Sequence, residues 1–169
     1  MRWLFGKFIL FSGIIILFSG VAQATTVPEG QADVKKEAKG FSKIAVFVNK
    51  NSSLKSMNKT QVRNFFLGRS RFSTASGRVI TYDFDSDSQI RKAFYQSVTG
   101  KDISVIDAYL ARLKYSGNVS LSLIESDWNS LLEAIKNDDK ALAYGPMSWF
   151  DTDSSNEFRI IYVLDVVEL

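Results

Sequence analysis

The sequence predicts a single α/β domain whose mostly parallel sheet is flanked by helices. Apolar runs of strand length alternate along the chain with segments in which apolar residues recur at helical spacing. The first run, residues 43–48, is almost continuously apolar, which is typical of a strand buried on both faces of a parallel sheet. The chain shows no internal repeat, so these elements are expected to form one domain rather than an array.

The first helix is predicted to follow a polar turn after this strand. Asn58 can act as its N-cap, and Gln61 three positions later completes a capping box. Gly68 is expected to end the helix, because glycine readily adopts the backbone conformation that terminates helices. The apolar face of this helix consists of Val62, Phe65 and Phe66.

A second strand is expected at residues 78–84, with a second helix directly after it. Ser86 is the predicted N-cap of this helix, and Asp85 and Asp87 lie near its positive end, where acidic side chains are favourable. The helix is expected to end at Gly100. Its apolar face consists of Ile90, Phe94 and Val98.

Predicted helices and strands also alternate in the second half of the domain. A third helix is expected to end near Gly117, and residues 118–124 fit either an extended connection or a short strand. Ser126 is the predicted N-cap of a fourth helix, which is followed by strands at residues 141–144 and 160–167. The apolar faces of the two helices consist of Ile106, Tyr109, Leu110 and Leu113, and of Trp128, Leu131, Leu132 and Ile135.

The N-terminus has the three parts of a secretory signal peptide. Basic residues precede an apolar run at residues 8–21, and Ala22 and Ala24 occupy the two positions that signal peptidase reads. The run of about fourteen residues is shorter than the roughly 20 that a membrane-spanning helix needs. We therefore predict that residues 1–24 are a signal peptide cleaved after Ala24, and that the mature chain is periplasmic without stable membrane insertion.

Residues 25–41 are polar and lack an apolar period, so they are predicted to be a flexible tail before the domain at residues 42–169.

The composition limits the chemistry and the partners that the chain can have. Loss of the signal peptide lowers the formal charge from +3 to about +1, which gives no support for a nucleic-acid partner. The absence of histidine and cysteine excludes serine–histidine triads, histidine zinc sites and thiol chemistry, and no cofactor or metal is expected.

One segment carries a family resemblance. Residues 61–69, Gln-Val-Arg-Asn-Phe-Phe-Leu-Gly-Arg, resemble a helix signature of small proteins related to the phosphate-binding proteins of phosphate ABC transporters, in the type 2 periplasmic binding protein superfamily. The resemblance covers roughly residues 43–165 and implies a single lobe of that fold. Phe66, Leu67 and Phe94 lie at helical apolar positions in matching segments, so we predict them to be core residues. Further matches in register include Phe72, Gly77, Val79, Ile90, Arg91, Val98, Gly100, Ala108 and Tyr109.

The resemblance also implies where a receptor of this family would hold phosphate. In full-length receptors, an arginine and an Asp-Gly-Ser-Gly-Thr-type turn bind the anion at a helix N-terminus. The corresponding stretch, residues 82–89, has neither the glycines nor the arginine, and it contains Asp83, Asp85 and Asp87. Each acid adds repulsion toward phosphate, about 1 kcal/mol at 4 Å in water. We therefore expect the isolated protein to bind inorganic phosphate no more tightly than about 1 mM.

Four residues are the candidates for a ligand site. Ser86 and Ser88 offer hydroxyl groups near the predicted helix N-terminus, and simple helix capping is the alternative explanation. Arg63 and Arg69 lie around the Phe-Leu-Gly turn, where they either hold an acidic ligand or form a solvated basic edge. In addition, the dipeptide at residues 149–150, Trp-Phe, is the predicted exposed aromatic patch.

The length of the chain limits its function. Full receptors close two lobes over a ligand, and a single lobe needs a partner, a homodimer or a cleft of its own to form a pocket. The leading hypothesis is a non-enzymatic periplasmic binding or interaction module, whose partner is a small oxyanion such as phosphate, an envelope protein or a second copy. The alternative is the solute-binding component of phosphate or related oxyanion transport. A third hypothesis is a hydrolase that uses only carboxylates, although no pair of acids stands out.

Overall fold

The computed structural model describes residues 42–117, 121–150 and 156–166. The predicted signal peptide at residues 1–24 and the predicted tail at residues 25–41 lie outside the described residues. Within the part that is described, none of the helices has the length and apolar character needed to cross a membrane.

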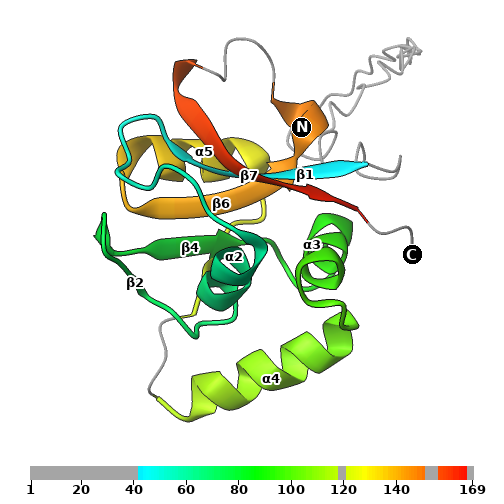
Figure 1. Ribbon diagram of the computed structural model, residues 1–169. Helices are drawn as coiled ribbons and strands as arrows, with labels where there is room; N and C mark the ends of the chain where they lie inside the picture. Colours follow the sequence, from blue (N-terminus) through cyan, green and yellow to red (C-terminus); the bar gives the residue numbers. More distant parts are fainter. Residues whose placement is uncertain (1–41, 118–120, 151–155, 167–169) are drawn as a thin grey trace, which may run out of the picture.

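A five-stranded sheet forms the centre of the domain, in the order β5-β4-β6-β1-β7 (Figure 1). β4 is parallel to β5 and to β6, whereas β1 is antiparallel to β6 and to β7. β1 alone therefore opposes the other strands of this sheet, and the predicted mostly parallel sheet is confirmed. The strands are β1 (Lys43–Asn49), β4 (Ile80–Asp83), β5 (Leu123–Ile124), β6 (Ala141–Pro146) and β7 (Phe158–Asp165).

The direction of the first strand differs from the sequence prediction. Residues 44–49 of β1 are all buried, as the apolar run predicts, but the expectation of parallel neighbours is wrong. Val46 lies opposite Tyr144 on one side and Tyr162 on the other, and both pairings are antiparallel. A continuous apolar run indicates burial on both faces, and a central antiparallel strand covered by helices has the same pattern.

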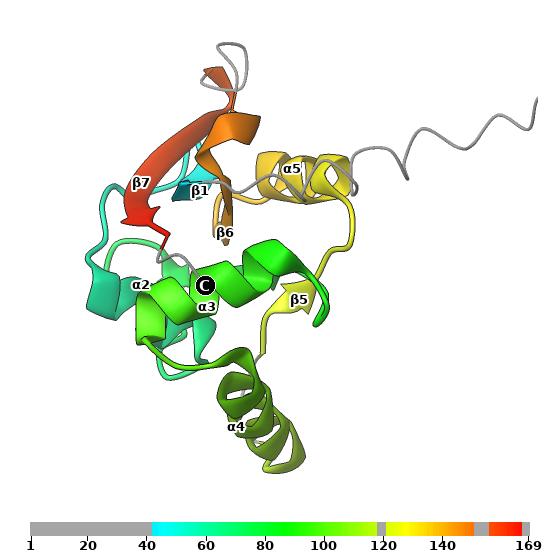
Figure 2. The same cartoon turned by 90° about the vertical axis from the view of Figure 1, so that its right-hand side faces the viewer.

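Helices pack on both sides of this sheet. α5 (Trp128–Asn137) lies on one side and α2 (Lys59–Phe66) lies on the other (Figures 1 and 2). α2 begins with the predicted capping box: the Asn58 side chain accepts from the Gln61 N–H at 3.0 Å, and the Gln61 side chain accepts from the Asn58 N–H at 2.9 Å. Beside the sheet, β2 (Phe72–Ser73) and β3 (Gly77–Arg78) form a short antiparallel pair.

Two predicted N-caps are displaced. α3 (Gln89–Thr99) has Ser88 as its N-cap instead of Ser86, because the Ser88 N–H bonds to the Asp85 carbonyl at 3.1 Å and closes a turn before the helix starts. α5 has Asp127 as its N-cap instead of Ser126. The Asp127 carboxylate accepts from the Ser130 N–H at 2.8 Å, and its negative charge also interacts favourably with the helix dipole.

The core contains the residues that the helical periodicity predicts. Phe66, Leu67 and Phe94 are 2%, 4% and 0% exposed, which confirms their assignment to the core. Phe66 packs edge-on against Phe94 with 4.8 Å between ring centres, so that α2 and α3 meet through these two rings. Gly100, with a φ of 70°, ends α3 in the left-handed conformation that glycine tolerates best.

The predicted exposed patch at Trp149 and Phe150 is wrong. A short 3-10 helix, η2 (Met147–Trp149), folds these rings back onto the domain. Trp149 packs against Trp128 with 5.0 Å between ring centres, and Phe150 packs edge-on against Phe47 at 4.8 Å. Trp128 also covers Gly145, where an added Cβ would lie 2.5 Å from the indole ring, so this position requires glycine.

The helix α4 (Ile103–Tyr115) stands apart from the rest of the domain. Figures 1 and 2 show it beyond α3, at a distance from the sheet. Ile106 is its buried residue, and Tyr109, Leu110 and Leu113, which were predicted to face inward, are only partly buried. Residues of α4 and of the β4–β5 side of the sheet line a common cleft.

Candidate functional site

A buried carboxylate, Asp83, lies at the end of β4 and is 3% exposed. Its Oδ1 accepts hydrogen bonds from the Phe84 N–H at 2.9 Å and from the Tyr144 hydroxyl. Its Oδ2 accepts from the Tyr95 hydroxyl at 2.8 Å and from the Arg91 Nε at 3.3 Å. An ionised carboxylate offers about four lone-pair positions, so protein donors take up the full capacity of this group.

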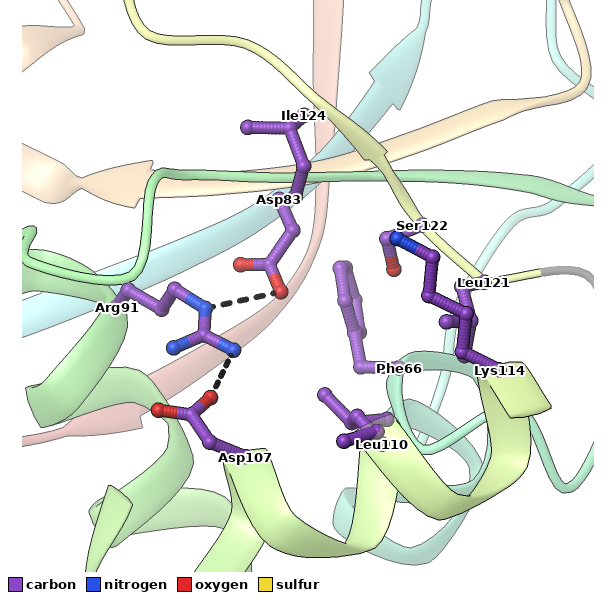
Figure 3. A pocket seen from close by; sticks show the side chains of 10 residues that line it. Phe66, Asp83, Arg91, Asp107, Leu110, Lys114, Leu121, Ser122 and Ile124 are labelled. Atoms are coloured by element: carbon purple, nitrogen blue, oxygen red, sulfur yellow. Dashed lines mark hydrogen bonds and ion pairs between the residues drawn. The ribbon is translucent and has the colours of Figure 1, made fainter. Parts of the chain in front are cut away.

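Arg91 connects this carboxylate to α4. Its Nη2 bonds to Asp107 Oδ1 at 2.6 Å, and Figure 3 shows the guanidinium lying between the two acids. The Arg91 side chain is 6% exposed, whereas that of Asp107 is 41% exposed. Because Asp83 belongs to β4, Arg91 to α3 and Asp107 to α4, this network fixes α4 relative to the sheet.

The network changes the acidity of its members. Burial raises the pKa of the Asp83 carboxyl, while the Arg91 charge and the hydrogen bonds from Tyr144, Tyr95 and the Phe84 N–H oppose that rise. Burial also raises the pKa of Tyr95 and of Tyr144 well above 10, and the negative charge of Asp83 adds to the effect. Both hydroxyls are therefore held in the protonated form in which they donate to Asp83.

This coupling predicts a loss of stability at alkaline pH. The folded-state pKa values of Tyr95 and Tyr144 exceed the unfolded value of about 10. The contribution of these two groups to the free energy of unfolding is therefore complete below about pH 10, and it is lost as the pH rises through their folded-state pKa values. We expect tyrosinate absorbance from these two residues to appear together with unfolding, and Tyr144→Phe to remove part of that signal. Tyr115→Phe, at a position that is 90% exposed, is the control. If all tyrosines ionised near pH 10 while the chain stayed folded, the network would be wrong.

Beside the network lies a cleft with a volume of about 430 Å³. Figure 3 shows the Arg91 ion pairs on one side of it and Lys114 on the other, with Phe66 and Leu110 between them. Its volume lies within the roughly 300–1,000 Å³ range of small-molecule sites. The remaining lining residues are Ala111, Leu121, Ser122 and Ile124. Of the three ways in which a single lobe could form a pocket, this cleft corresponds to the third, a cleft of its own.

The four predicted site residues do not line this cleft. Ser86 is exposed, and Ser88 is the N-cap of α3 without a capping hydrogen bond from its side chain. Arg63 and Arg69 instead line a separate pocket of about 170 Å³ beside α4. The structure therefore brings the two arginines together, and neither serine lines that pocket.

Sequence reasoning missed the residues of the network. Asp83 was read only as part of an acidic run, and Arg91 only as a position of family resemblance. A signal was present, because Arg91 directly follows the buried Ile90 and lies three residues before the buried Phe94. A charged residue beside an apolar helical face is a candidate for a buried ion pair, because a charge that becomes buried needs a partner. Within the described residues, no group of three or more acidic side chains is placed to hold a metal ion.

The sheet and the helices on its two sides form a single α/β lobe. No protein-family model matches the chain, and no curated protein matches it. Similar solved structures include one assigned as a phosphate ABC transporter substrate-binding protein from Clostridium perfringens, with bound phosphate, at 17% identity and a TM-score of 0.54. An ABC-type phosphate transport receptor from Vibrio cholerae has 13% identity and a TM-score of 0.54.

A third similar structure is a candidate phosphate-binding protein from Planctomyces limnophilus, at 15% identity and a TM-score of 0.52. These likenesses cover 72%, 72% and 78% of this chain, but 44%, 46% and 47% of the other chains. This chain thus spans less than half the length of each of these three proteins. At such low identity the comparison shows the fold, and the fold is the one that the sequence resemblance implied.

Proposed function

We propose that this chain is a non-enzymatic periplasmic binding module, a single lobe that recognises a solute or an envelope protein through its own cleft. The observation that carries this proposal is the cleft of about 430 Å³ formed within one lobe. Its lining combines ion-paired side chains with apolar ones, which is the usual composition of binding sites. The likeness in fold to substrate-binding proteins supports binding rather than catalysis.

The chemistry of the network also supports a non-enzymatic role. A general base or nucleophile needs a free lone pair directed at the substrate. Both oxygens of Asp83 are already engaged by protein donors, and Arg91 uses two guanidinium nitrogens on Asp83 and Asp107. Asp83 therefore acts as a structural connection beside the cleft.

The same contacts argue against phosphate binding by the route that receptors of this family use. The α3 N-terminus carries Ser88 as a cap and has Asp85 and Asp87 just before it. Arg91, in the first turn, is directed into the interior and paired there with Asp83. The helix end contributes about half a positive charge, which is less than the negative charge of the neighbouring acids.

The alternative function is the solute-binding component of phosphate or related oxyanion transport. The phosphate in the Clostridium perfringens structure supports it, because that protein shares the fold. Against it stands the α3 N-terminus, where Asp85 and Asp87 precede the helix and Arg91 is paired with Asp83. The transport component would hold the anion at the turn before α3, whereas the proposed binding module would not.

The periplasmic, non-enzymatic assignment is tested on protein recovered from cells. We expect the mature chain in the periplasmic extract with Thr25 as its first residue, and no hydrolysis of carboxylic esters, phosphate esters or glycosides above the buffer rate. Recovery of intact Met1 in the membrane fraction would contradict the location. Turnover that Asp83→Asn abolishes without unfolding the chain would contradict the non-enzymatic role.

A further inference from the structure

A second pocket, of about 170 Å³, lies beside α4 and is lined by three cationic side chains. Arg63 comes from α2, Arg69 follows the C-terminal end of α2, and Lys101 follows the end of α3. Thr99 and Tyr109 complete the polar part, and the apolar part consists of Leu67, Val105 and Ile106. The pocket is distinct from the cleft beside Asp83, because the two have no lining residue in common.

The positive charge of this pocket is not compensated by its own lining. No acidic side chain lines it, and in the described part of the chain none of the three cations forms a salt bridge. The nearest acid in sequence is Asp102, beside Lys101. Its carboxylate is engaged by Ser104, accepting from the N–H at 2.8 Å and from the hydroxyl at 2.6 Å.

Two of the cations are placed to bind a ligand. Arg63 lines the pocket, and its buried Nε has no hydrogen-bond partner within the described residues, so no protein acceptor there holds this nitrogen. Arg69 donates from Nε to the Tyr109 hydroxyl at 3.3 Å, and its guanidinium lies 5.4 Å from the centre of that ring. This stacking orients the Arg69 guanidinium before any ligand arrives.

We infer that this pocket binds a small oxyanion, such as phosphate or sulfate, between Arg63, Arg69 and Lys101. Arginine forks match the geometry of tetrahedral oxyanions, and hydrogen bonds between charged groups are the strongest kind. The volume is below the roughly 300 Å³ at which sites for drug-sized ligands begin, which favours a small ion over a larger solute. The inference goes beyond the proposed function, because it assigns a ligand class to a pocket that the proposed function does not use.

Calorimetric titration of the mature chain with sodium phosphate and sodium sulfate at low ionic strength tests this inference. We expect a dissociation constant of about 1 mM for both anions. Arg63→Gln and Arg69→Gln should each weaken binding by about tenfold, because each removes one charged donor. Added sodium chloride should weaken binding further, because the pocket is partly open to solvent.

Arg112→Gln is the matched control, because Arg112 also contributes a positive charge on α4 but lines neither this pocket nor the cleft. It should leave the affinity unchanged, and circular dichroism should show that all the variants are folded. Affinity that is unchanged in both Arg63→Gln and Arg69→Gln, or no binding at about 10 mM anion, would overturn the inference. Either result leaves the proposed function standing, because that function depends on the cleft. Affinity lost only on replacing Ser86 and Ser88 would overturn this inference and favour the transport alternative.

Discussion

Replacing Arg91 by methionine is expected to lower the free energy of unfolding by about 3–5 kcal/mol, because it leaves the buried Asp83 without its cation. Methionine keeps much of the volume of the arginine stem, so the loss reports the charge and hydrogen bonds more than the packing. The Asp83 and Arg91 side chains are only 3% and 6% exposed, which leaves little water to screen the unpaired carboxylate. Chemical denaturation of both proteins at neutral pH measures the difference.

The control for this prediction is Asp107→Asn, which removes the exposed end of the same network. Asp107 is 41% exposed, so this change should cost no more than about 1 kcal/mol. A loss below about 1 kcal/mol for Arg91→Met would contradict the buried network. Equal losses of unfolding free energy in the two variants would show that the loss comes from the packing of α4 against the domain and not from the unpaired charge of Asp83.

Truncating Phe94 to alanine is the second change with a large expected effect, about 3–5 kcal/mol of unfolding free energy. Phe94 is 0% exposed and stacks on Tyr144 with 3.7 Å between ring centres and 5° between ring planes. It also contacts Phe66 edge-on, so the side chain connects α3, α2 and β6. Loss of the ring leaves a cavity at this junction and removes the apolar cover from Tyr144.

Phe72→Ala provides the comparison for Phe94→Ala, because the same group is deleted where it is 69% exposed. Its effect should lie within about 0.5 kcal/mol of zero. Denaturant midpoints with an unchanged slope would show that both variants unfold in the same way. Similar costs for the two truncations would mean that the apolar face of α3 does not pack as described.

Much of the fold could be predicted because burial leaves a local pattern. Phe66 and Phe94 fall on helical apolar faces, and Asn58 with Gln61 marks a helix start through residues only three apart. Strand direction leaves no such pattern. The run at residues 43–48 has the same composition whether its neighbours are parallel or antiparallel, so β1 was assigned the wrong direction.

The residues of the buried network and of the pocket beside α4 were harder to predict, because they meet only through the topology. Asp83 and Tyr144 are 61 positions apart, and their hydrogen bond exists because β4 and β6 are neighbours in the sheet. Arg63 and Arg69 could be grouped in advance because they flank one turn. Lys101 joins them only because α3 packs against α2, and that packing cannot be read from the local sequence.

We expect that this lobe does not use the α3 N-terminus as a phosphate site. The most direct test of this expectation is a calorimetric phosphate titration of the mature chain and of the double variant Ser86→Ala with Ser88→Ala, in low salt with sulfate as the control anion. We predict the same dissociation constant for both proteins, because that turn by itself binds no more tightly than about 1 mM. A micromolar constant for the native chain that disappears in the double variant would contradict the account and establish the turn as the anion site.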